Sequence, residues 1–543
     1  MEFYVLIGGE AGQGAYSIEL EVTEMLSRLN YHFFATKNYM SRVRGGHNFH
    51  MVRVADHPVS ALSGEKWDMV IALDKETETR HRPFLREDGF YLSRKLTMDI
   101  AKEANDEFHD MTAANTILVG VILSVIGADF GRARNFAEGT RLLHLMKGFK
   151  LASRWGMAGT YPLRPTAGNH CIFDGNRAIA FGALTGGCQF FAGYPMTPAT
   201  SIMHYYSSAS ASLPIHFEQA EDEIAAINMA LGASYGGVRS MTATSGGGFA
   251  LMQEGISLAG MTETPVVVVV AQRPGPATGL PTRTEQGDLN FVIHSGHGEF
   301  PRIVFAPGSI VEAINLTRIA FELADRCQIP VIILTDQYFA DSVHVVEEEL
   351  PTDVLIRDQA TFDPAYRRYA LTPGGISPLT CPGLSDALVC ADSDEHDEAG
   401  RITEDLTLRI HMVDKRRGKI KLLGRDCVLP TYKGDLRADH VVISWGSNKL
   451  VVEEAVKKLV REGIRMASLH FSQVYPLSED MIAPYGLASK ILICVENNAE
   501  GQFAGLLKRE LGISVTHSVL KYNGECFTVE ELFSRLKPLI SQG

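Results

Sequence analysis

The sequence lacks closely paired cysteines. None of its eight cysteines forms a C-x-x-C pair, the arrangement that commonly holds zinc or an iron–sulfur cluster. They are Cys171, Cys188, Cys327, Cys381, Cys390, Cys427, Cys494 and Cys526. We therefore interpret them as reduced thiols of the protein core, and we predict no metal site in this chain.

Long apolar runs and an excess of basic residues are also absent. No run reaches the roughly 18 apolar residues needed to span a bilayer, so we expect no membrane association. Residues 1–7 lack the basic region and the small-residue cleavage site of a secretion signal. We therefore predict that they form the first strand and are not part of a signal peptide. The formal charge of −13 disfavours nucleic-acid binding, which needs a basic face. These features together predict a cytoplasmic protein.

The order of predicted elements indicates an α/β fold. The 543 residues suffice for three or four domains of roughly 100–200 residues each. Strands alternate with helical patterns in three stretches, which predicts three α/β domains with mostly parallel sheets. The predicted divisions are a first module at 1–165, a second at 166–346, an irregular connecting segment at 347–430 and a third domain at 431–543.

Apolar runs between turn residues indicate the individual strands. The unbroken valine run at 266–270 is typical of a strand buried on both faces of a parallel sheet. The other predicted strands are 3–7, 32–36, 50–54, 69–72, 240–244, 302–305, 330–334, 440–444, 465–470 and 490–495. The predicted helices include 16–29, 449–462 and 502–511. Prolines and an acidic cluster at 392–398 set the connecting segment apart from these patterns.

A glycine-rich turn joins the first predicted strand to the first helix. Backbone N–H groups and the helix N-terminus converge there, so Gly12 and Gly14 are candidate phosphate contacts. The glycine spacing is G-x-x-G-x-G and the next strand is followed by Lys37 rather than an acid, so we do not expect NAD binding. Arg42 and Arg44 stand beside two more glycines and suit a pyrophosphate or a ribose phosphate. The alternative for this second loop is a solvated basic surface.

Two candidate site residues occur early in the second module. Thr197 lies between two prolines, so its backbone is rigid and its hydroxyl has a defined direction. Glu223 stands in the first turn of a predicted helix, beside the apolar face of that helix. An acidic residue at a helix start usually caps the helix or complements its dipole, and this remains the alternative for Glu223.

Small residues and arginines follow two of the predicted strands. The turn at 245–248, S-G-G-G, lets a ligand approach the backbone closely. The segment 271–289, which contains Arg273 and Arg283, follows the valine strand. Both segments begin where strands end, at the edge where open α/β sheets bind their ligands.

These motifs together resemble those of the 2-oxoacid:ferredoxin oxidoreductases, and the likeness spans nearly the whole chain. In that family a gamma module with G-G-x-x-G-Q-G and S-R-x-R-G-G-H is often fused to an alpha module. The alpha module carries Y-P-x-T-P, E-x-x-A, T-A-T-S-G-x-G and Q-R-x-G-P-x-T-G-x-P-T. All six motifs occur here in that order, at 8–14, 41–47, 194–198, 223–226, 242–248 and 272–282. The stretch 495–502 is similar to part of the family's transketolase C-terminal-like domain.

The resemblance implies thiamine diphosphate as cofactor and coenzyme A as co-substrate. Enzymes that use thiamine diphosphate hold Mg²⁺ and the diphosphate with a Gly-Asp-Gly motif, which this chain lacks. The chain would then supply only the pyrimidine side of the site, and a partner beta subunit would hold the diphosphate, Mg²⁺ and a 4Fe-4S cluster. Ferredoxin would be the electron partner, and the expected assembly is a dimer of heterodimers.

The resemblance also implies roles for the residues near the cofactor. Glu223 would be the carboxylate that activates the pyrimidine ring, because its position in the helix matches the family spacing, and Glu221 is the runner-up. Thr197, in the same motif as Tyr194, would face the cofactor or the substrate carboxylate.

Substrate and acceptor contacts are implied in the same way. Either Arg273 or Arg283 would pair with the substrate carboxylate, and one sequence does not decide between the two guanidiniums. The implied contacts for coenzyme A are Gly12, Gly14, Arg42 and Arg44.

The predicted reaction is the oxidative decarboxylation of a 2-oxoacid to an acyl-CoA, or the reverse reductive carboxylation. We favour 2-oxoglutarate, because the segments 393–398 and 414–417 resemble subunits assigned to that substrate. Pyruvate, branched-chain and aryl 2-oxoacids stay open. A non-redox thiamine-diphosphate enzyme is disfavoured by the missing diphosphate motif. A regulatory protein that binds coenzyme A would leave 194–198 and Glu223 unexplained.

Overall fold

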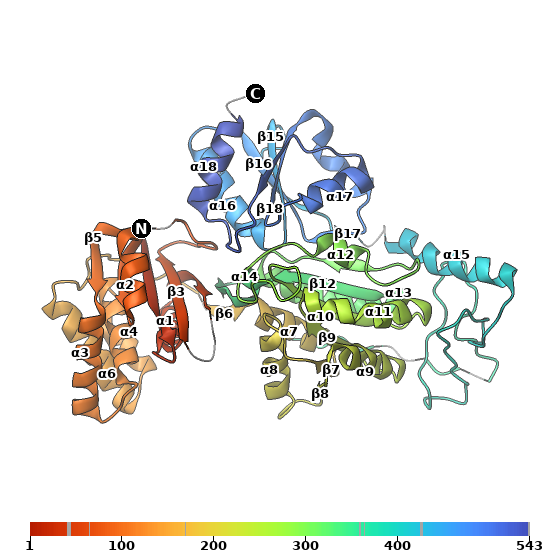
Figure 1. Cartoon of the computed structure of the whole chain (residues 1–543), viewed down its shortest axis with the longest axis horizontal. Coiled ribbons are helices and arrows are strands. Elements are labelled where there is room, and N and C mark those ends of the chain that lie inside the picture. The colour runs from red at the N-terminus through yellow and green to blue at the C-terminus, as the bar shows by residue number, and fades with distance from the viewer. Residues whose placement is uncertain are drawn as a thin grey trace. The chain divides into compact units, whose positions relative to one another are not determined.

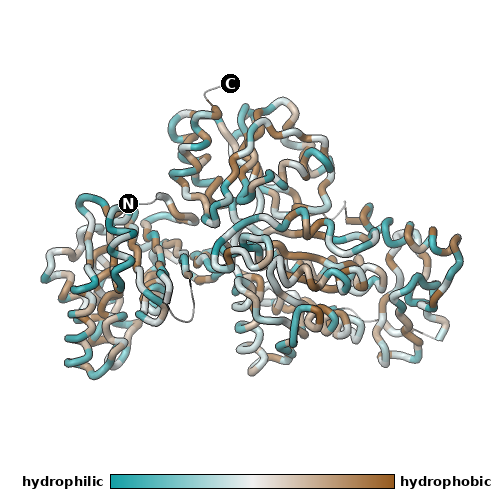
Figure 2. Tube along the Cα trace, viewed as in Figure 1, coloured by the Kyte–Doolittle hydropathy of each residue, from teal (hydrophilic) through white to brown (hydrophobic). Residues whose placement is uncertain are grey.

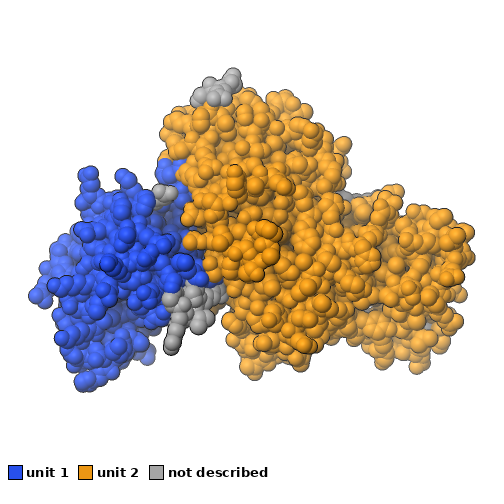
Figure 3. All heavy atoms as spheres, viewed as in Figure 1, with its two compact units in different colours: residues 1–174, 341–349, 528–530 blue, residues 175–340, 350–527, 531–543 orange. Residues whose placement is uncertain are grey.

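Within its described residues, the chain forms two seven-stranded sheets and one five-stranded sheet (Figure 1). The computed structural model describes residues 1–40, 45–64, 66–168, 170–357, 360–362, 364–423 and 427–540. The chain divides into two compact units, coloured separately in Figure 3. Unit 1 comprises Met1–Asp174, Asp341–Glu349 and Thr528–Glu530, and unit 2 comprises Gly175–Ala340, Leu350–Phe527 and Glu531–Gly543. The predicted α/β class is confirmed, whereas the four-part division of the sequence stays a prediction.

Unit 1 is built on a mixed sheet of order β5-β4-β1-β3-β2-β13-β6. Strand β1 pairs parallel with β4 and antiparallel with β3, the central strand of the sheet. Helices α1 and α4 pack into one hydrophobic cluster with β1 and β2, and α4 is buried along nearly its whole length. The strands are β1 (Glu2–Ala11), β2 (His32–Asn38), β3 (Gly45–Ala55), β4 (Trp67–Ala72), β5 (Leu85–Leu92), β6 (Cys171–Asp174) and β13 (Val343–Val346). The helices are α1 (Ala15–Arg28), α2 (Lys75–His81), α3 (Arg94–Phe108), α4 (Ala113–Val125), α5 (Phe130–Ala133) and α6 (Gly139–Arg154).

Two short strands far along the chain complete this sheet. β13 lies between β2 and β6 and pairs antiparallel with both. The chain therefore leaves unit 1 after β6 and returns to it as β13. The sequence pattern predicted neither strand.

The main sheet of unit 2 has the order β17-β11-β12-β10-β9-β7-β8. The valine run forms the middle of β10, which pairs parallel with β9 and β12 and is buried at all seven positions, as predicted. The strands are β7 (Phe190–Gly193), β8 (His216–Gln219), β9 (Ser240–Thr244), β10 (Val266–Gln272), β11 (Ile303–Phe305), β12 (Pro330–Asp336) and β17 (Gln473–Tyr475). The helices are α7 (Gly175–Thr185), α8 (Thr200–Ala209), α9 (Glu223–Tyr235), α10 (Gly246–Leu251), α11 (Gln253–Met261), α12 (Leu289–Ile293) and α13 (Ile310–Cys327), and α14 (Gln337–Asp341) follows β12.

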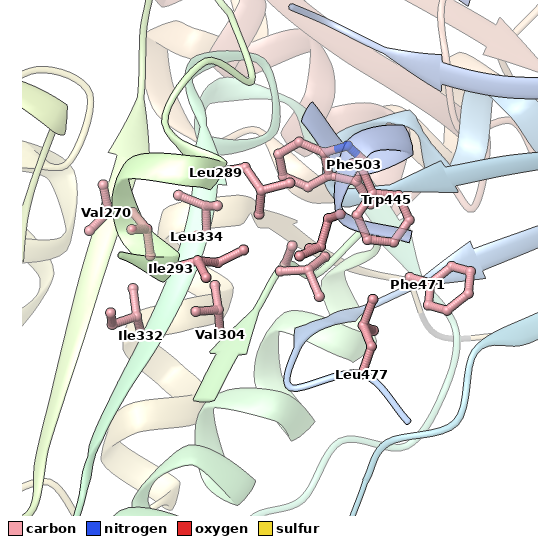
Figure 4. Packing of buried hydrophobic residues seen from close by; sticks show 14 of the residues in the cluster. Val270, Leu289, Ile293, Val304, Ile332, Leu334, Trp445, Phe471, Leu477 and Phe503 are labelled. Carbon is pink, nitrogen blue, oxygen red and sulfur yellow. The ribbon is translucent and has the colours of Figure 1, made fainter. Parts of the chain in front are cut away.

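The five-stranded sheet of unit 2 has the order β14-β16-β15-β18-β19. Its apolar residues join those of the main sheet in one cluster, in which Trp445 and Phe503 lie near Leu289 (Figure 4). Hydrophobic stretches, brown in Figure 2, recur along the strands of this unit. The strands are β14 (Thr431–Gly434), β15 (His440–Trp445), β16 (Met466–Phe471), β18 (Ile491–Glu496) and β19 (His517–Leu520). The helices are α16 (Lys449–Arg461) and α17 (Gln502–Leu511), and α18 (Val529–Ile540) ends the described chain.

The segment predicted to be irregular contains an 18-residue helix, α15 (Leu406–Leu423). Its buried positions include Lys415 and Lys419, which both form ion pairs of 2.5 Å with the buried carboxylate of Glu263. Because this helix buries charged side chains, it has no apolar stripe to reveal it in the sequence. The prediction of an irregular structure was wrong for these residues.

Within the described residues, no single helix is long and apolar enough to cross a membrane. Helices α3 and α4 together have the length and apolar composition of a membrane span, but the pair is bent by 118°.

Candidate active site

The candidate site lies at the carboxyl edge of the parallel strands β7, β8, β9 and β10. These strands are neighbours in the sheet and run in the same direction, so the segments that follow them emerge at one edge. Open α/β sheets bind their ligands at this edge. The sequence-predicted residues of the second module all lie in these segments.

Glu223 begins α9 and is only 3% exposed. Asp222, not Glu223, caps the helix: its Oδ1 accepts the backbone N–H of Ala225 at 2.7 Å. The Oε1 atom of Glu223 is buried and has no hydrogen-bond partner among the described residues. A buried polar atom without a partner is costly, so this position suits a ligand that brings its own polar group. Glu221, the alternative, is exposed.

The glycine turn after β9 lies directly against this carboxylate. A Cβ atom added at Gly248 would collide with the Thr244 hydroxyl and lie 2.5 Å from Oε1 of Glu223. A Cβ atom at Gly246 would collide with the carboxylate of Asp288. A side chain at Gly248 would displace Glu223 and one at Gly246 would displace Asp288, so glycine at both positions leaves the two acids in place.

The loop after β7 is tied to the loops after β9 and β10. Nη1 of Arg273 donates to the backbone carbonyl of Thr197 at 2.7 Å, and the Ser245 hydroxyl donates to the sulfur of Met196. Thr197 and Arg273 are half-buried, whereas Tyr194 is exposed. The structure thus brings Thr197 and Arg273 together through the main chain of Thr197.

Asp288 is a site residue that the sequence analysis missed. It lies beside Gly246, and its backbone N–H donates to Oε1 of Gln272 at 2.9 Å. Burial raises the pKa of the Asp288 carboxyl to about 6, although the Arg273 guanidinium acts to lower it. Burial also lowers the pKa of Arg273, and Asp288 acts to raise it again. The available signal was an acid at the end of the 271–289 segment, but its burial could not be read from the sequence.

The raised pKa of Asp288 predicts a pH-dependent change in stability. Between about pH 4 and pH 6 the folded protein keeps a proton that the unfolded chain releases, so this group makes the fold less stable as the pH rises. In Asp288→Asn this penalty is absent. We expect the free energy of unfolding of the variant, relative to wild type, to increase by about 1–3 kcal/mol between pH 4 and pH 7. Denaturant unfolding at both pH values measures the change, and a constant difference would contradict the assignment.

The second half of the 271–289 segment is fastened to the five-stranded domain. The N–H of Thr284 donates to the carbonyl of Gly524 at 3.2 Å, and the side chain of Arg283 lies beside Gly524. Buried Gln286 accepts the side-chain N–H of Asn448 at 2.8 Å and the main-chain N–H of Asn497 at 3.0 Å. The side chain of Arg283 thus lies beside this domain, whereas Arg273 contacts the Thr197 loop.

In unit 1 the glycine turn lies between β1 and α1. Gly12 and Gly14 both have positive φ angles, 94° and 97°, and Gly14 is the residue before the first turn of α1. A Cβ atom at Gly14 would collide with the side chain of Asn115. The predicted contacts Arg42 and Arg44 lie outside the described residues.

This geometry suits the predicted thiamine-diphosphate cofactor: a buried carboxylate without a partner among the described residues faces closely packed glycines at the start of α10, at the ligand-binding edge of a parallel sheet. Residues 181–415 match the family described as "Pyruvate flavodoxin/ferredoxin oxidoreductase, thiamine diP-bdg". Residues 4–138 match "Pyruvate ferredoxin/flavodoxin oxidoreductase". The fold and the site thus define a subunit of a thiamine-diphosphate-dependent oxidoreductase.

The relatives that this chain resembles identify the family more closely. The "2-oxoacid:ferredoxin oxidoreductase subunit alpha" of Sulfolobus sp is 31% identical over 99% of this chain and 97% of that protein. The "2-oxoglutarate synthase subunit KorA" of Methanocaldococcus jannaschii is 33% identical over 60% of this chain and 88% of that protein. The solved structure of a 2-oxoglutarate:ferredoxin oxidoreductase from Magnetococcus marinus has a TM-score of 0.90 and 28% identity, covering 99% of both chains. The chain belongs to the 2-oxoacid:ferredoxin oxidoreductase family, and the predicted family, enzyme class and cofactor are confirmed.

Proposed function

We propose that this chain supplies the pyrimidine side of the thiamine-diphosphate site in an enzyme that interconverts 2-oxoglutarate and succinyl-CoA, with ferredoxin as electron partner. The observation that carries this proposal is the buried Oε1 of Glu223, which has no hydrogen-bond partner among the described residues and lies beside the glycine turn. The substrate is supported by the Magnetococcus marinus structure, whose title records bound 2-oxoglutarate, coenzyme A and succinyl-CoA. The Methanocaldococcus jannaschii relative is named for 2-oxoglutarate as well.

Bound thiamine diphosphate would supply the nucleophilic carbon and store the electrons released when CO₂ departs. Glu223 would hold a proton at the pyrimidine nitrogen, because its Oε1 is desolvated and free to accept a hydrogen bond.

Arg273 would bind the carboxylate of the 2-oxoacid, and Thr197 would orient the substrate or the cofactor with its hydroxyl. Asp288 would place a titratable charge near Arg273. Gly246 and Gly248 would keep side chains out of the space beside both acids.

The rest of the active site would come from a partner. No Gly-Asp-Gly motif occurs in the sequence, so a beta subunit would hold the diphosphate, Mg²⁺ and a 4Fe-4S cluster. The expected assembly remains a dimer of heterodimers, and the cytoplasmic location remains a prediction from the sequence.

An assay of the co-purified complex tests the proposed reaction. Reduction of a viologen dye would be followed with a panel of 2-oxoacids, each with and without coenzyme A. We expect 2-oxoglutarate with coenzyme A to have the highest kcat/KM. Preference for pyruvate, branched-chain or aryl 2-oxoacids would reassign the substrate within the family, and activity without any dye reduction would refute the redox function.

A separate prediction concerns the binding of coenzyme A by the first module, residues 1–165, which resembles the family's gamma module. Arg42 and Arg44 would meet only the phosphates of the acceptor, so the double variant Arg42→Ala, Arg44→Ala should raise the KM for coenzyme A by about tenfold or more. Decarboxylation that needs no coenzyme A should partly persist. Steady-state kinetics with varied coenzyme A measures the effect, and an unchanged KM would mean that these arginines form a solvated loop.

A further inference from the structure

Two histidines and a glutamate of unit 1 converge at one end of three neighbouring strands. His32 begins β2, His170 directly precedes β6, and Glu347 directly follows β13. β13 pairs antiparallel with both other strands, and Val346 is paired with Cys171. The next position of that ladder brings His170 opposite Glu347. The register of the sheet therefore brings the three residues together, although they are far apart in the sequence.

The distances between these side chains match those of a metal site. Nε2 of His170 lies 3.3 Å from Oε1 of Glu347, and Nε2 of His32 lies 3.6 Å from the same oxygen. One ligand atom from each residue lies within 4.8 Å of the others. Nitrogen and oxygen atoms held about 2.0–2.2 Å from a tetrahedral zinc ion are about 3.3–3.6 Å apart, so two of the three separations already have the required length.

The surroundings hold the ligands in place and leave the site open on one side. The side chains of His32 and His170 are only 5% and 0% exposed, whereas that of Glu347 is 45% exposed. The backbone carbonyl of His170 accepts the Ser27 hydroxyl at 2.9 Å. The Thr166 hydroxyl lies 3.2 Å from Nε2 of His170, the proposed ligand atom, and would give up this contact when a metal ion binds. Burial restricts the two imidazoles, while water can reach the cluster from the side of Glu347.

We propose that His32, His170 and Glu347 bind a divalent transition-metal ion, with zinc as the natural candidate. Two imidazoles and one carboxylate suit zinc and neighbouring late first-row metals, whereas Mg²⁺ prefers oxygen ligands alone. The three protein ligands leave a fourth position for water. The ion would fasten β2 to the two chain segments through which the polypeptide leaves unit 1, one after Asp174 and one after Glu349. None of the three ligands belongs to the candidate cofactor site, so we assign the ion the role of linking these segments.

Zinc binding by the purified native complex tests this proposal. The complex would be dialysed against zinc chloride and then against metal-free buffer, and bound zinc would be measured by mass spectrometry. The variants are Glu347→Gln, which changes an exposed side chain and should leave the fold intact, and His32→Ala. The control is His216→Ala, because His216 also faces a carboxylate, that of Glu218 at 3.4 Å, but belongs to no cluster of three ligands among the described residues.

We expect one zinc ion per chain in wild type and in His216→Ala. Both ligand variants should lose this ion. The affinity for zinc should fall by about tenfold or more in Glu347→Gln. Added zinc should also raise the melting temperature of wild type and of His216→Ala but not of Glu347→Gln. Cobalt provides a second readout, because tetrahedral Co²⁺ absorbs visible light strongly, and this absorption should be absent from both ligand variants. Equal zinc in wild type and both ligand variants, or full retention by Glu347→Gln, would overturn the proposal.

Discussion

Replacing Glu223 with glutamine should reduce turnover by on the order of 10²–10⁴-fold while the complex still assembles. Glutamine keeps the size and polarity of the side chain but cannot take up the proton of the pyrimidine ring. Removing the charge should not disturb α9, because Asp222 caps that helix through Ala225. Exchange of the proton on carbon 2 of thiamine diphosphate, followed in the assembled complex, measures this step without substrate or ferredoxin.

Glu221→Gln is the matched control for this experiment. Glu221 lies two residues earlier in the same segment and is exposed, so its replacement should leave the exchange rate near that of wild type. If Glu223 merely complements the helix dipole, its replacement should cost only about 0.3–1 kcal/mol of stability and leave turnover nearly unchanged. Wild-type exchange in Glu223→Gln, with slow exchange in Glu221→Gln, would transfer the role to Glu221.

Replacing Arg273 with alanine should raise the KM for the 2-oxoacid by about 30-fold or more. Deleting one partner of a desolvated guanidinium–carboxylate pair costs about 2–5 kcal/mol, and Arg273 is only half-buried, so we expect the lower part of this range. The KM for coenzyme A should change far less, because its phosphates are assigned to the gamma module. Initial rates with each substrate varied in turn separate the two effects.

Arg283→Ala tests the other candidate arginine. The side chain of Arg283 lies beside Gly524 of the five-stranded domain, so we expect its loss to affect stability more than the KM for the 2-oxoacid. A large rise in that KM for Arg283→Ala, with a silent Arg273→Ala, would exchange the two roles. If Arg273 only supports the Thr197 loop through its hydrogen bond to the Thr197 carbonyl, its loss should lower kcat and leave both KM values unchanged.

Many elements of the fold were predictable from local sequence. Strand β9 and helix α17 have the predicted bounds, and β10, β12, β15 and β18 differ from prediction by at most two residues at either end. These are mostly strands buried in parallel sheets, whose apolar runs are conspicuous between turns. Helix α15 was missed because its buried Lys415 and Lys419 pair with Glu263, more than 150 residues earlier in the sequence.

The sequence by itself determined the α/β class, the family motifs and the residues Glu223, Thr197 and Arg273 as site candidates, because each depends on residue types at short fixed spacing. Only the tertiary structure decided which side chains are buried and which meet. It separated buried Glu223 from exposed Glu221, placed Asp288 against the glycine turn with a raised pKa, and brought His32, His170 and Glu347 together. Burial and strand register arise from contacts between distant segments, and no local pattern in the sequence encodes them.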